Sequence, residues 1–297
     1  MSLSGKEPAS LAHFVRKLRG GSQPILAVAN DDHLYFIKFT NNLQGPNLSF
    51  NESMGSELYR LSNLPGPCWR PILVTGSFLD ENQDCWMETE KGRLRPQEGL
   101  CFGSRFLCEE KTRLFEILPG ASYKRVRNLD DFWLAWLLDI CASHADNRQA
   151  IFTQNTSGLL DAIFIDHGHM YGGPAGKNRL HFKASRYLDR RVYSRVSSNL
   201  VSTLRRSAAR VDADRLWANA RILPDDWKTA SAFKRLAETL ETLSKPRLIE
   251  GVIETVMDSY RREDGIASID SEYQRPPTVS VLRPAIQSAE LRRLVIH

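Results

Sequence analysis

Two aspartates in the middle of the chain have the residue type and spacing that phosphoryl transfer requires. Asp146 lies in a strongly polar run after a long apolar segment, and Asp166 follows the apolar run Ala162–Ile165. Phosphoryl transfer needs one carboxylate to accept or orient the proton of the acceptor hydroxyl and another to hold Mg²⁺ on the phosphates. Either aspartate alone would more often be a helix cap or a turn residue, but the ordered pair favours this chemistry.

A glycine-rich turn and a strand lysine lie upstream of the two aspartates. Arg19–Gln23 precedes the apolar runs Ile25–Ala29 and Leu34–Phe39, which the Asn and Asp residues between them predict to be a β-hairpin. Glycine lets backbone N–H groups approach phosphates closely. Lys38 stands in an apolar strand, where an unpaired ammonium is costly, and Glu52 is the natural anionic partner. An edge-strand lysine that points to solvent is the plainer alternative.

Taken in order, these motifs resemble the HipA-like kinase family. The resemblance spans roughly residues 15–200 and rests on six runs: Arg19–Pro24, Leu34–Asn42, Asn51-Glu52, Phe102–Arg105, Asp146–Phe152 and Ile165–Gly168. It implies an α+β, two-lobed, protein-kinase-like fold, with a small mixed β-rich N-lobe, a mainly helical C-lobe, and ATP and Mg²⁺ as cofactors. Residues 1–108 would form the N-lobe, residues 109–262 the C-lobe with the catalytic loop, and residues 263–297 a flexible or extended tail.

The resemblance also assigns a role to each matching residue. Asp146 would be the catalytic base, while Arg148 would either contact a phosphate or brace the catalytic loop. Asp166 would be a metal ligand, Lys38 would contact the nucleotide phosphates, and Glu52 would brace that lysine. The nucleotide-binding turn would be formed by Gly20, Gly21, Ser22 and Gln23. The expected activity is transfer of the γ-phosphate of ATP to a hydroxyl, of a protein serine or threonine or of a small molecule.

One position departs from the wider kinase pattern. The asparagine expected five residues after the catalytic aspartate, as the second metal ligand, is replaced by Ile151, which cannot ligate a cation. Gln149 or Asn147 could supply a carbonyl oxygen instead, and we favour Gln149. The departure motivates an alternative function, a pseudokinase or nucleotide-sensing module that regulates or scaffolds a partner without turnover.

The overall composition excludes several other classes of protein. The chain has 297 residues, of which 42% are hydrophobic and 25% are charged, so it is not disordered as a whole. Its five cysteines are scattered without a CxxC pair, which argues against a zinc ribbon or disulfide framework and for a reducing compartment. Residues 1–10 lack the features of a secretory signal, and no apolar run is long enough to span a membrane. We therefore expect a cytoplasmic protein.

The net charge of +5 is unevenly distributed along the chain. Residues 1–169 carry 17 Lys and Arg against 20 Asp and Glu, whereas residues 170–297 carry 23 against 15. The basic half could dock an acidic or regulatory protein partner, although solvated helix faces are the plainer reading. Aromatic residues are sparse among its arginines and no nucleic-acid-binding signature is present, so nucleic-acid binding is only a weak third hypothesis.

Hydrophobic periodicity predicts the remaining elements. The next helix should span Asn51–Leu61, followed by strands at Ile72–Phe78 and Cys85–Thr89. Asn128 should cap a buried helix that runs into the Asp146 loop, and the strands Ala150–Phe152 and Ala162–Ile165 should follow. Further helices are expected over four ranges: Ser185–Val211, Ala213–Ala220, Trp227–Leu243 and Pro246–Arg261.

Overall fold

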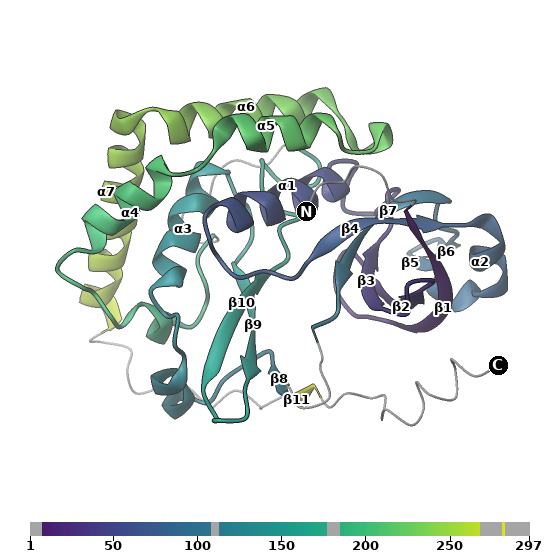
Figure 1. Ribbon diagram of the computed structural model, residues 1–297, viewed down its shortest axis with the longest axis horizontal. Helices are drawn as coiled ribbons and strands as arrows, with labels where there is room; N and C mark the ends of the chain where they lie inside the picture. Colours follow the sequence, from purple (N-terminus) through teal and green to yellow (C-terminus); the bar gives the residue numbers. More distant parts are fainter. Residues whose placement is uncertain (1–7, 108–112, 177–184, 268–280, 283–297) are drawn as a thin grey trace.

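The computed structural model describes residues 8–107, 113–176, 185–267 and 281–282, and its N-terminal part is a closed five-stranded barrel (Figure 1). The strand order around the barrel is β1-β2-β3-β7-β4. The strands are β1 (Ala9–Lys17), β2 (Ile25–Ala29), β3 (Leu34–Lys38), β4 (Trp69–Val74) and β7 (Gly99–Arg105). All neighbours are antiparallel except β1 and β4, whose parallel pairing closes the barrel. The predicted hairpin between β2 and β3 is confirmed.

Two barrel strands were not predicted. β1 carries His13 and Arg16 and is interrupted by two register shifts against β2, so it lacks a clean alternation of apolar and polar residues. β7 begins at Gly99 and contains Gly103, and glycines weaken the sequence pattern of a strand. Gly103 packs directly against Ile72. Both strands are held by pairing with their neighbours rather than by local sequence preference.

The predicted strand Ile72–Phe78 is wrong in its second half. β4 ends at Val74, and Thr75 caps helix α2 (Gly76–Glu81) by accepting a hydrogen bond from the Phe78 amide at 3.2 Å. A threonine cap of this kind satisfies an amide that would otherwise lack a partner. After a short 3₁₀ turn η1 (Gln83–Cys85), the hairpin β5 (Met87–Thr89) and β6 (Gly92–Leu94) completes this part of the chain.

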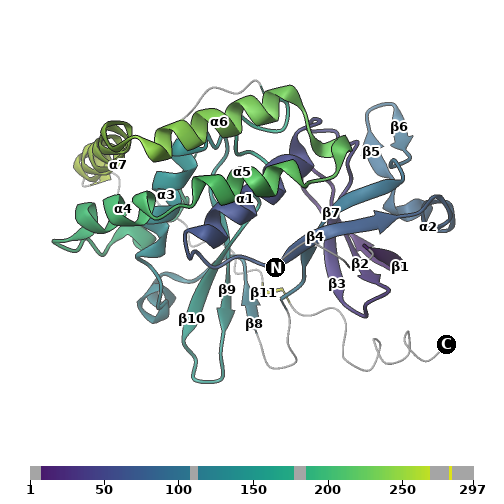
Figure 2. The same ribbon diagram turned by 45° about the horizontal axis from the view of Figure 1, so that its top comes forward.

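Helix α1 (Leu48–Leu61) joins the barrel to the C-terminal part. It begins three residues earlier than predicted, because Leu48 and Phe50 are buried and extend its apolar face. Its contacts include β4 and β7 on the barrel side and α5 (Ala213–Arg221) on the other, as Figures 1 and 2 show. The helix is therefore placed to carry residues of the site.

The C-terminal part is built on the buried helix α3 (Asp131–Cys141) and a sheet of order β10-β9-β8-β11. The strands are β8 (Arg113–Phe115), β9 (Gln149–Gln154), β10 (Leu160–Ile165) and β11 (Val281–Leu282). Asn128 does not cap α3 as predicted. Its side chain instead exchanges hydrogen bonds with the backbone of Ala162 on β10 and donates to the Asp131 carboxylate, so it fastens the strand to the start of the helix.

The structure describes four further helices, α4 (Leu200–Ala209), α5, α6 (Ala230–Ser244) and α7 (Pro246–Ala267), with 3₁₀ turns η2 (Gly120–Arg125), η3 (Arg190–Tyr193) and η4 (Asp225–Trp227) elsewhere in this part. Of these helices, α4, α6 and α7 contact α3, whereas α5 packs against α1 and α6. Helices α5 and α6 lie side by side across the top of the molecule in Figure 1. The single helix predicted over Ser185–Val211 is wrong, because residues before Leu200 form η3 and irregular backbone around the buried Tyr193. α7 continues five residues past the predicted C-lobe boundary; most of the predicted tail lies outside the described residues. Among the described helices, none is long and apolar enough to cross a membrane.

Two helical glycines give a matched test of how tightly α1 packs. A Cβ on Gly55 would lie 2.4 Å from the His167 Cβ, whereas a Cβ on Gly251 of α7 would meet nothing within 4 Å. Alanine favours a helix over glycine by up to about 1 kcal/mol. We therefore expect Gly251→Ala to raise the free energy of unfolding by about 0.5–1 kcal/mol and Gly55→Ala to lower it, measured by urea denaturation. Equal stabilisation by both substitutions would show that α1 is not in close contact with residue 167.

Candidate active site

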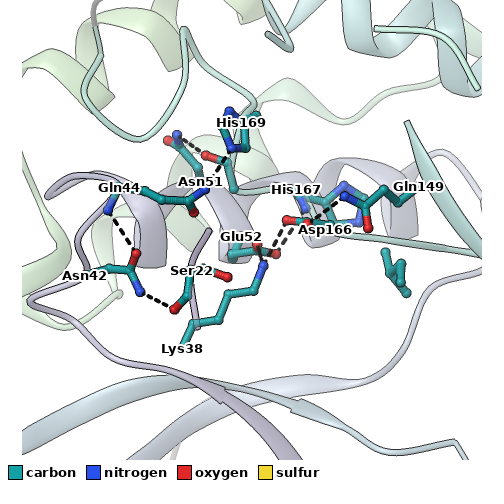
Figure 3. Close-up of polar contacts among 12 residues, drawn as sticks. Ser22, Lys38, Asn42, Gln44, Asn51, Glu52, Gln149, Asp166, His167 and His169 are labelled. Atoms are coloured by element: carbon teal, nitrogen blue, oxygen red, sulfur yellow. Dashed lines mark hydrogen bonds and ion pairs between the residues drawn. The ribbon is translucent and has the colours of Figure 1, made fainter. Parts of the chain in front are cut away.

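The ammonium of Lys38 lies between two carboxylates that come from different parts of the chain (Figure 3). At the end of β3, Lys38 forms ion pairs with Glu52 of α1 and with Asp166, the Asp166 contact being 2.9 Å. The predicted pairing of Lys38 with Glu52 is therefore present, and the alternative of a lysine pointing to solvent is wrong. Asp166, which follows β10, completes a contact that joins the barrel, α1 and the C-terminal sheet.

Burial and charge give the two carboxylates different properties. Burial alone would lower the pKa of Lys38, but Asp166 and Glu52 reverse this and hold the pKa above its usual value. Burial raises the pKa of Glu52, whose side chain is 3% exposed. Asp166 is 29% exposed, and Lys38 lowers its pKa although burial acts in the opposite direction. Glu52 is thus enclosed as a brace, whereas Asp166 is the ionised carboxylate that solvent and ligands can reach.

The backbone after β10 is shaped to present Asp166. Its φ is +60°, a left-handed conformation that is uncommon for residues other than glycine. The next amide, of His167, donates to Glu52 at 3.1 Å, and the Gly168 carbonyl accepts from the side chain of Asn51 at 2.9 Å. A Cβ on Gly168 would lie 2.5 Å from Leu48 and 2.9 Å from Glu52. Only glycine lets the loop approach α1 this closely.

The register of β9 against β10 decides which residue reaches Asp166. Gln149 pairs with Ile165, so it lies beside the strand end that leads into Asp166, and its Nε2 donates to Asp166 Oδ2 at 3.0 Å. Ile151 pairs with Ile163 inside the sheet, two residues further from that end. Of the residues of this strand, Gln149 is therefore the one in contact with the Asp166 carboxylate.

Arg148 takes the bracing position and not the phosphate-facing one. Its guanidinium is buried and forms two hydrogen bonds to Asp139 of α3, at 2.8 and 2.7 Å. It also donates to the backbone carbonyls of Ile165, at 2.8 Å, and Asp166, at 3.3 Å. Tyr59 of α1 lies below the guanidinium and donates to Asp139 at 2.7 Å. Arg148 thereby fixes the backbone that carries Asp166 and is a positioning residue.

Asp146 lies in the loop between α3 and β9 and is partly exposed. Its carboxylate accepts the backbone amide of Asn147 at 2.7 Å, which leaves further lone pairs for a hydroxyl donor. Its carbonyl accepts from Nδ1 of the buried His144 at 2.6 Å. Burial and the nearby Arg148 lower the pKa of His144 to about 4, so the ring is neutral and carries its proton on Nδ1.

The glycine-rich turn connects β1 to β2 at the same end of the barrel as Lys38. The Gln23 amide donates to the Gly20 carbonyl at 3.1 Å, and Gly20 has a φ of +133°. Gln23 exchanges two hydrogen bonds with the backbone of Glu88, so its side chain secures the turn to β5. Gly21 is exposed, and Ser22 is buried with its carbonyl bonded to Asn42. Gly20 and Gly21 are thus both exposed, with open space beside Gly20 and the Gln44 side chain on one side of Gly21.

Several contributors to the site were missed by sequence reasoning. Asp139 and Tyr59 lie within otherwise apolar helix faces, where a single polar residue gives no periodic signal. Asn51 stands out in the sequence only as the neighbour of Glu52. The one available signal was the charge itself, because an aspartate within the apolar stripe of α3 requires a buried cationic partner.

The oxygen donors around Asp166 fit a magnesium ion bound together with phosphates. In the described part of the chain, no group of three or more His, Cys, Asp or Glu side chains could hold a metal ion by itself. Mg²⁺ is usually held by one or two carboxylates, with substrate phosphates and water completing six positions. The accessible carboxylate of Asp166 meets this requirement, and Gln149 is near enough to add a carbonyl oxygen if its carboxamide turns over.

Loss of the buried partner of Arg148 is expected to destabilise the protein strongly. Asp139→Asn leaves the buried guanidinium without its counter-ion, which should lower the free energy of unfolding by about 3–5 kcal/mol. Glu250→Gln breaks the exposed pair with Arg205 and should leave the free energy of unfolding nearly unchanged, because solvent screens exposed charges. Urea denaturation followed by tryptophan fluorescence measures both, and a small effect of Asp139→Asn would contradict the bracing role.

Acid is expected to destabilise the fold through its buried histidines. The pKa of His144 falls from 6.5 in the unfolded chain to about 4 in the folded one, so below pH 6.5 the unfolded state binds more protons. Stability supplied by the neutral ring is present above pH 6.5 and is lost between pH 6.5 and 4. From pH 7 to pH 5 the free energy of unfolding should fall by about 2 kcal/mol because of His144. His167, whose pKa is also lowered by burial, should add to this fall. His144→Asn should flatten this pH dependence in chemical denaturation; a profile parallel to wild type would exclude the assignment.

Comparison with known proteins identifies the fold. The sequence matches no model of a known protein family and no curated protein. Among solved structures, hydra Fam20, solved with a sugar, is similar with a TM-score of 0.53 and 11% identity, over 86% of this chain and 88% of that one. The Helicobacter pylori proinflammatory kinase CtkA is similar with a TM-score of 0.51 and 10% identity, over 82% of this chain and 94% of the other. The chain has a protein-kinase-like fold, with a β-rich N-terminal part and a helical C-terminal part.

Proposed function

We propose that the protein is an ATP- and Mg²⁺-dependent phosphotransferase of the HipA-like kinase type, which transfers the γ-phosphate to a hydroxyl of a protein serine or threonine. The observation that carries this proposal is the contact of Lys38 with both Glu52 and Asp166. The protein-kinase-like fold and the order of the motifs along the chain support it. The two lobes, residues 1–108 and 109–262, would enclose the nucleotide at their junction.

Nucleotide binding would depend on the glycine-rich turn and on Lys38. The backbone N–H groups of the exposed Gly20 and Gly21 would face the phosphates, since no Cβ separates them from a ligand. Lys38 would contact phosphate oxygens while Glu52 keeps its ammonium in place. Because Lys38 has two carboxylate neighbours, its positive charge is already compensated, and the phosphates need a further cation.

Asp166 and Gln149 would hold Mg²⁺, which when bound neutralises phosphate charge and orients the transferred group. The Gln149 carboxamide donates to Asp166 in the present structure, and a half-turn would bring its oxygen beside the same carboxylate. Two oxygens so placed repel each other unless a cation lies between them. The reorientation is therefore expected only with the metal.

Asp146 would orient the acceptor hydroxyl and take its proton. The hydroxyl oxygen forms a bond to the γ-phosphorus as the bond from that phosphorus to the β–γ bridging oxygen breaks, and ADP leaves with the electron pair. The proton passes to the Asp146 carboxylate. Neutral His144 fixes the loop by its hydrogen bond to the Asp146 carbonyl, and Arg148 fixes the backbone of Asp166.

A nucleotide-sensing regulatory module without turnover is the second candidate function. It is favoured by Ile151, which lies in β9 and offers no oxygen where other kinases have a metal-binding asparagine. In that case the basic half of the chain would dock an acidic or regulatory partner. A serine or threonine acceptor and a cytoplasmic location stay predictions from the sequence, and nucleic-acid binding stays the weak third hypothesis.

Two aspartate substitutions are expected to separate turnover from binding. Asp146→Asn should lower ATP turnover about 100- to 10,000-fold, as for loss of a general base, and keep the stabilisation by Mg·ATP. At a hundredfold excess over Kd that stabilisation is about 2.7 kcal/mol, a rise in Tm of about 5–10 °C for a chain of this size. Asp166→Asn should lose both turnover and the Mg²⁺-dependent part of the rise.

Asp161→Asn is the matched control. Asp161 lies on β10, the strand that leads into Asp166, but it forms an ion pair with the exposed Arg127. This substitution should leave turnover and the Tm rise unchanged. Turnover by Asp166→Asn equal to wild type would refute catalysis at this site. A Tm rise in a wild-type protein that shows no turnover would establish the sensing module, and no rise with any nucleotide or metal would refute nucleotide binding.

A further inference from the structure

The loop between β3 and α1 contacts the glycine-rich turn through a buried asparagine. Asn42 is 7% exposed, and its Nδ2 donates to the Ser22 carbonyl at 2.8 Å. Its Oδ1 accepts the backbone amide of Gln44 at 3.1 Å, so the same side chain fixes the backbone that precedes the Gln44 side chain. One end of this loop is therefore attached to the glycine-rich turn.

The other end of the loop is anchored to the C-terminal part. The Asn47 amide donates to the Pro174 carbonyl at 2.9 Å, and its side chain bonds Thr229 and Ser231 at the start of α6. Gly45 has a φ of +144° and lies so close to Pro174 that a Cβ would be 2.6 Å from its carbonyl oxygen. The loop thus spans from the turn to the C-terminal part within a few residues.

Gln44 stands in the middle of this span, between the turn and the loop that carries Asp166 (Figure 3). Its Nε2 lies 3.2 Å from Nε2 of His169, three residues after Asp166. On the other side, a Cβ on Gly21 would lie 2.7 Å from the same nitrogen. The Gln44 carboxamide therefore packs against the backbone of Gly21 in the turn and, at the same time, forms a hydrogen bond with His169 in the Asp166 loop. A residue larger than glycine at position 21 would displace it.

We propose that Gln44 is a positioning residue that latches the glycine-rich turn to the Asp166 loop through His169 and so retains the nucleoside triphosphate. The latch is a contact within the fold itself, and its effect on nucleotide retention rests on the proposed function. A net hydrogen bond between partly exposed groups shifts an equilibrium by about fivefold. A latch of this strength opens readily for entry of the nucleotide and still slows its release.

Hydrogen exchange tests the latch without any nucleotide. In Gln44→Ala, peptides covering residues 18–24 should exchange faster than in wild type, because the side-chain contact to His169 that supports the turn is lost while the Asn42 bond to Ser22 remains. The Gln23 amide, bonded within the turn to Gly20, is the natural reporter. Gln83→Ala, at an exposed glutamine of η1, is the control and should exchange as wild type does. Unchanged exchange in Gln44→Ala would overturn the latch.

Nucleotide affinity then tests the coupling to His169. The Kd for Mg·ATP should rise about fivefold in Gln44→Ala and in His169→Ala, and by about the same factor in the double variant, because either change breaks one shared contact. A product of the two factors, about 25-fold, would show that the residues act independently and would overturn the proposal. If wild type bound no nucleotide, the proposed function would fall while the exchange experiment still decided the latch.

Discussion

The structure of the site depends on one ammonium shared by two carboxylates. Lys38 is too deeply enclosed to remain unpaired, and each of its partners comes from a separate element, Glu52 from α1 and Asp166 from the turn after β10. Satisfying this single charge fixes the relative positions of barrel, helix and sheet. Buried ion pairs contribute little net stability compared with apolar packing, but removal of one partner is costly. The contact therefore specifies an arrangement more than it strengthens the fold.

Helix α1 connects the parts of the site because three of its residues lie on one face. Glu52, Gly55 and Tyr59 are spaced at i, i+3 and i+7. Glu52 holds Lys38 and the His167 amide, Gly55 lets the loop approach, and Tyr59 bonds Asp139, which in turn holds Arg148. A rotation of the helix would break all of these contacts together. Helix α1 thus positions the side chain of Asp166 through Glu52 and Lys38. It positions the backbone of Asp166 through Tyr59, Asp139 and Arg148.

The sequence predicted the groups that must be charged and missed those that only support them. Lys38, Glu52 and Asp166 stand out because a lysine in an apolar strand and a carboxylate after one need partners, and the structure brings them together. Asp139 inside the apolar stripe of α3 also needs a buried cation, but no pattern in the sequence indicates that this cation is Arg148, so the role of Arg148 stayed open. Strand β1 was missed because pairing with β2 and β4 overrides its irregular pattern. Gly76–Phe78 was mistaken for strand because the Thr75 cap acts through one local hydrogen bond.

Under the proposed function, the charge balance of the site makes the position of Gln149 more important than the presence of Ile151. One ammonium and two carboxylates leave a net negative charge, and Asp166 is the partner that is accessible to solvent. A triphosphate would add negative charge to the same space, so Lys38 alone cannot hold it there. A divalent cation resolves this imbalance, and it needs oxygen donors at the accessible carboxylate. The strand register brings residue 149 and not residue 151 to that carboxylate. An asparagine at position 151 would lie further along β9, so under the proposed function the donor from this strand would be Gln149 at its start.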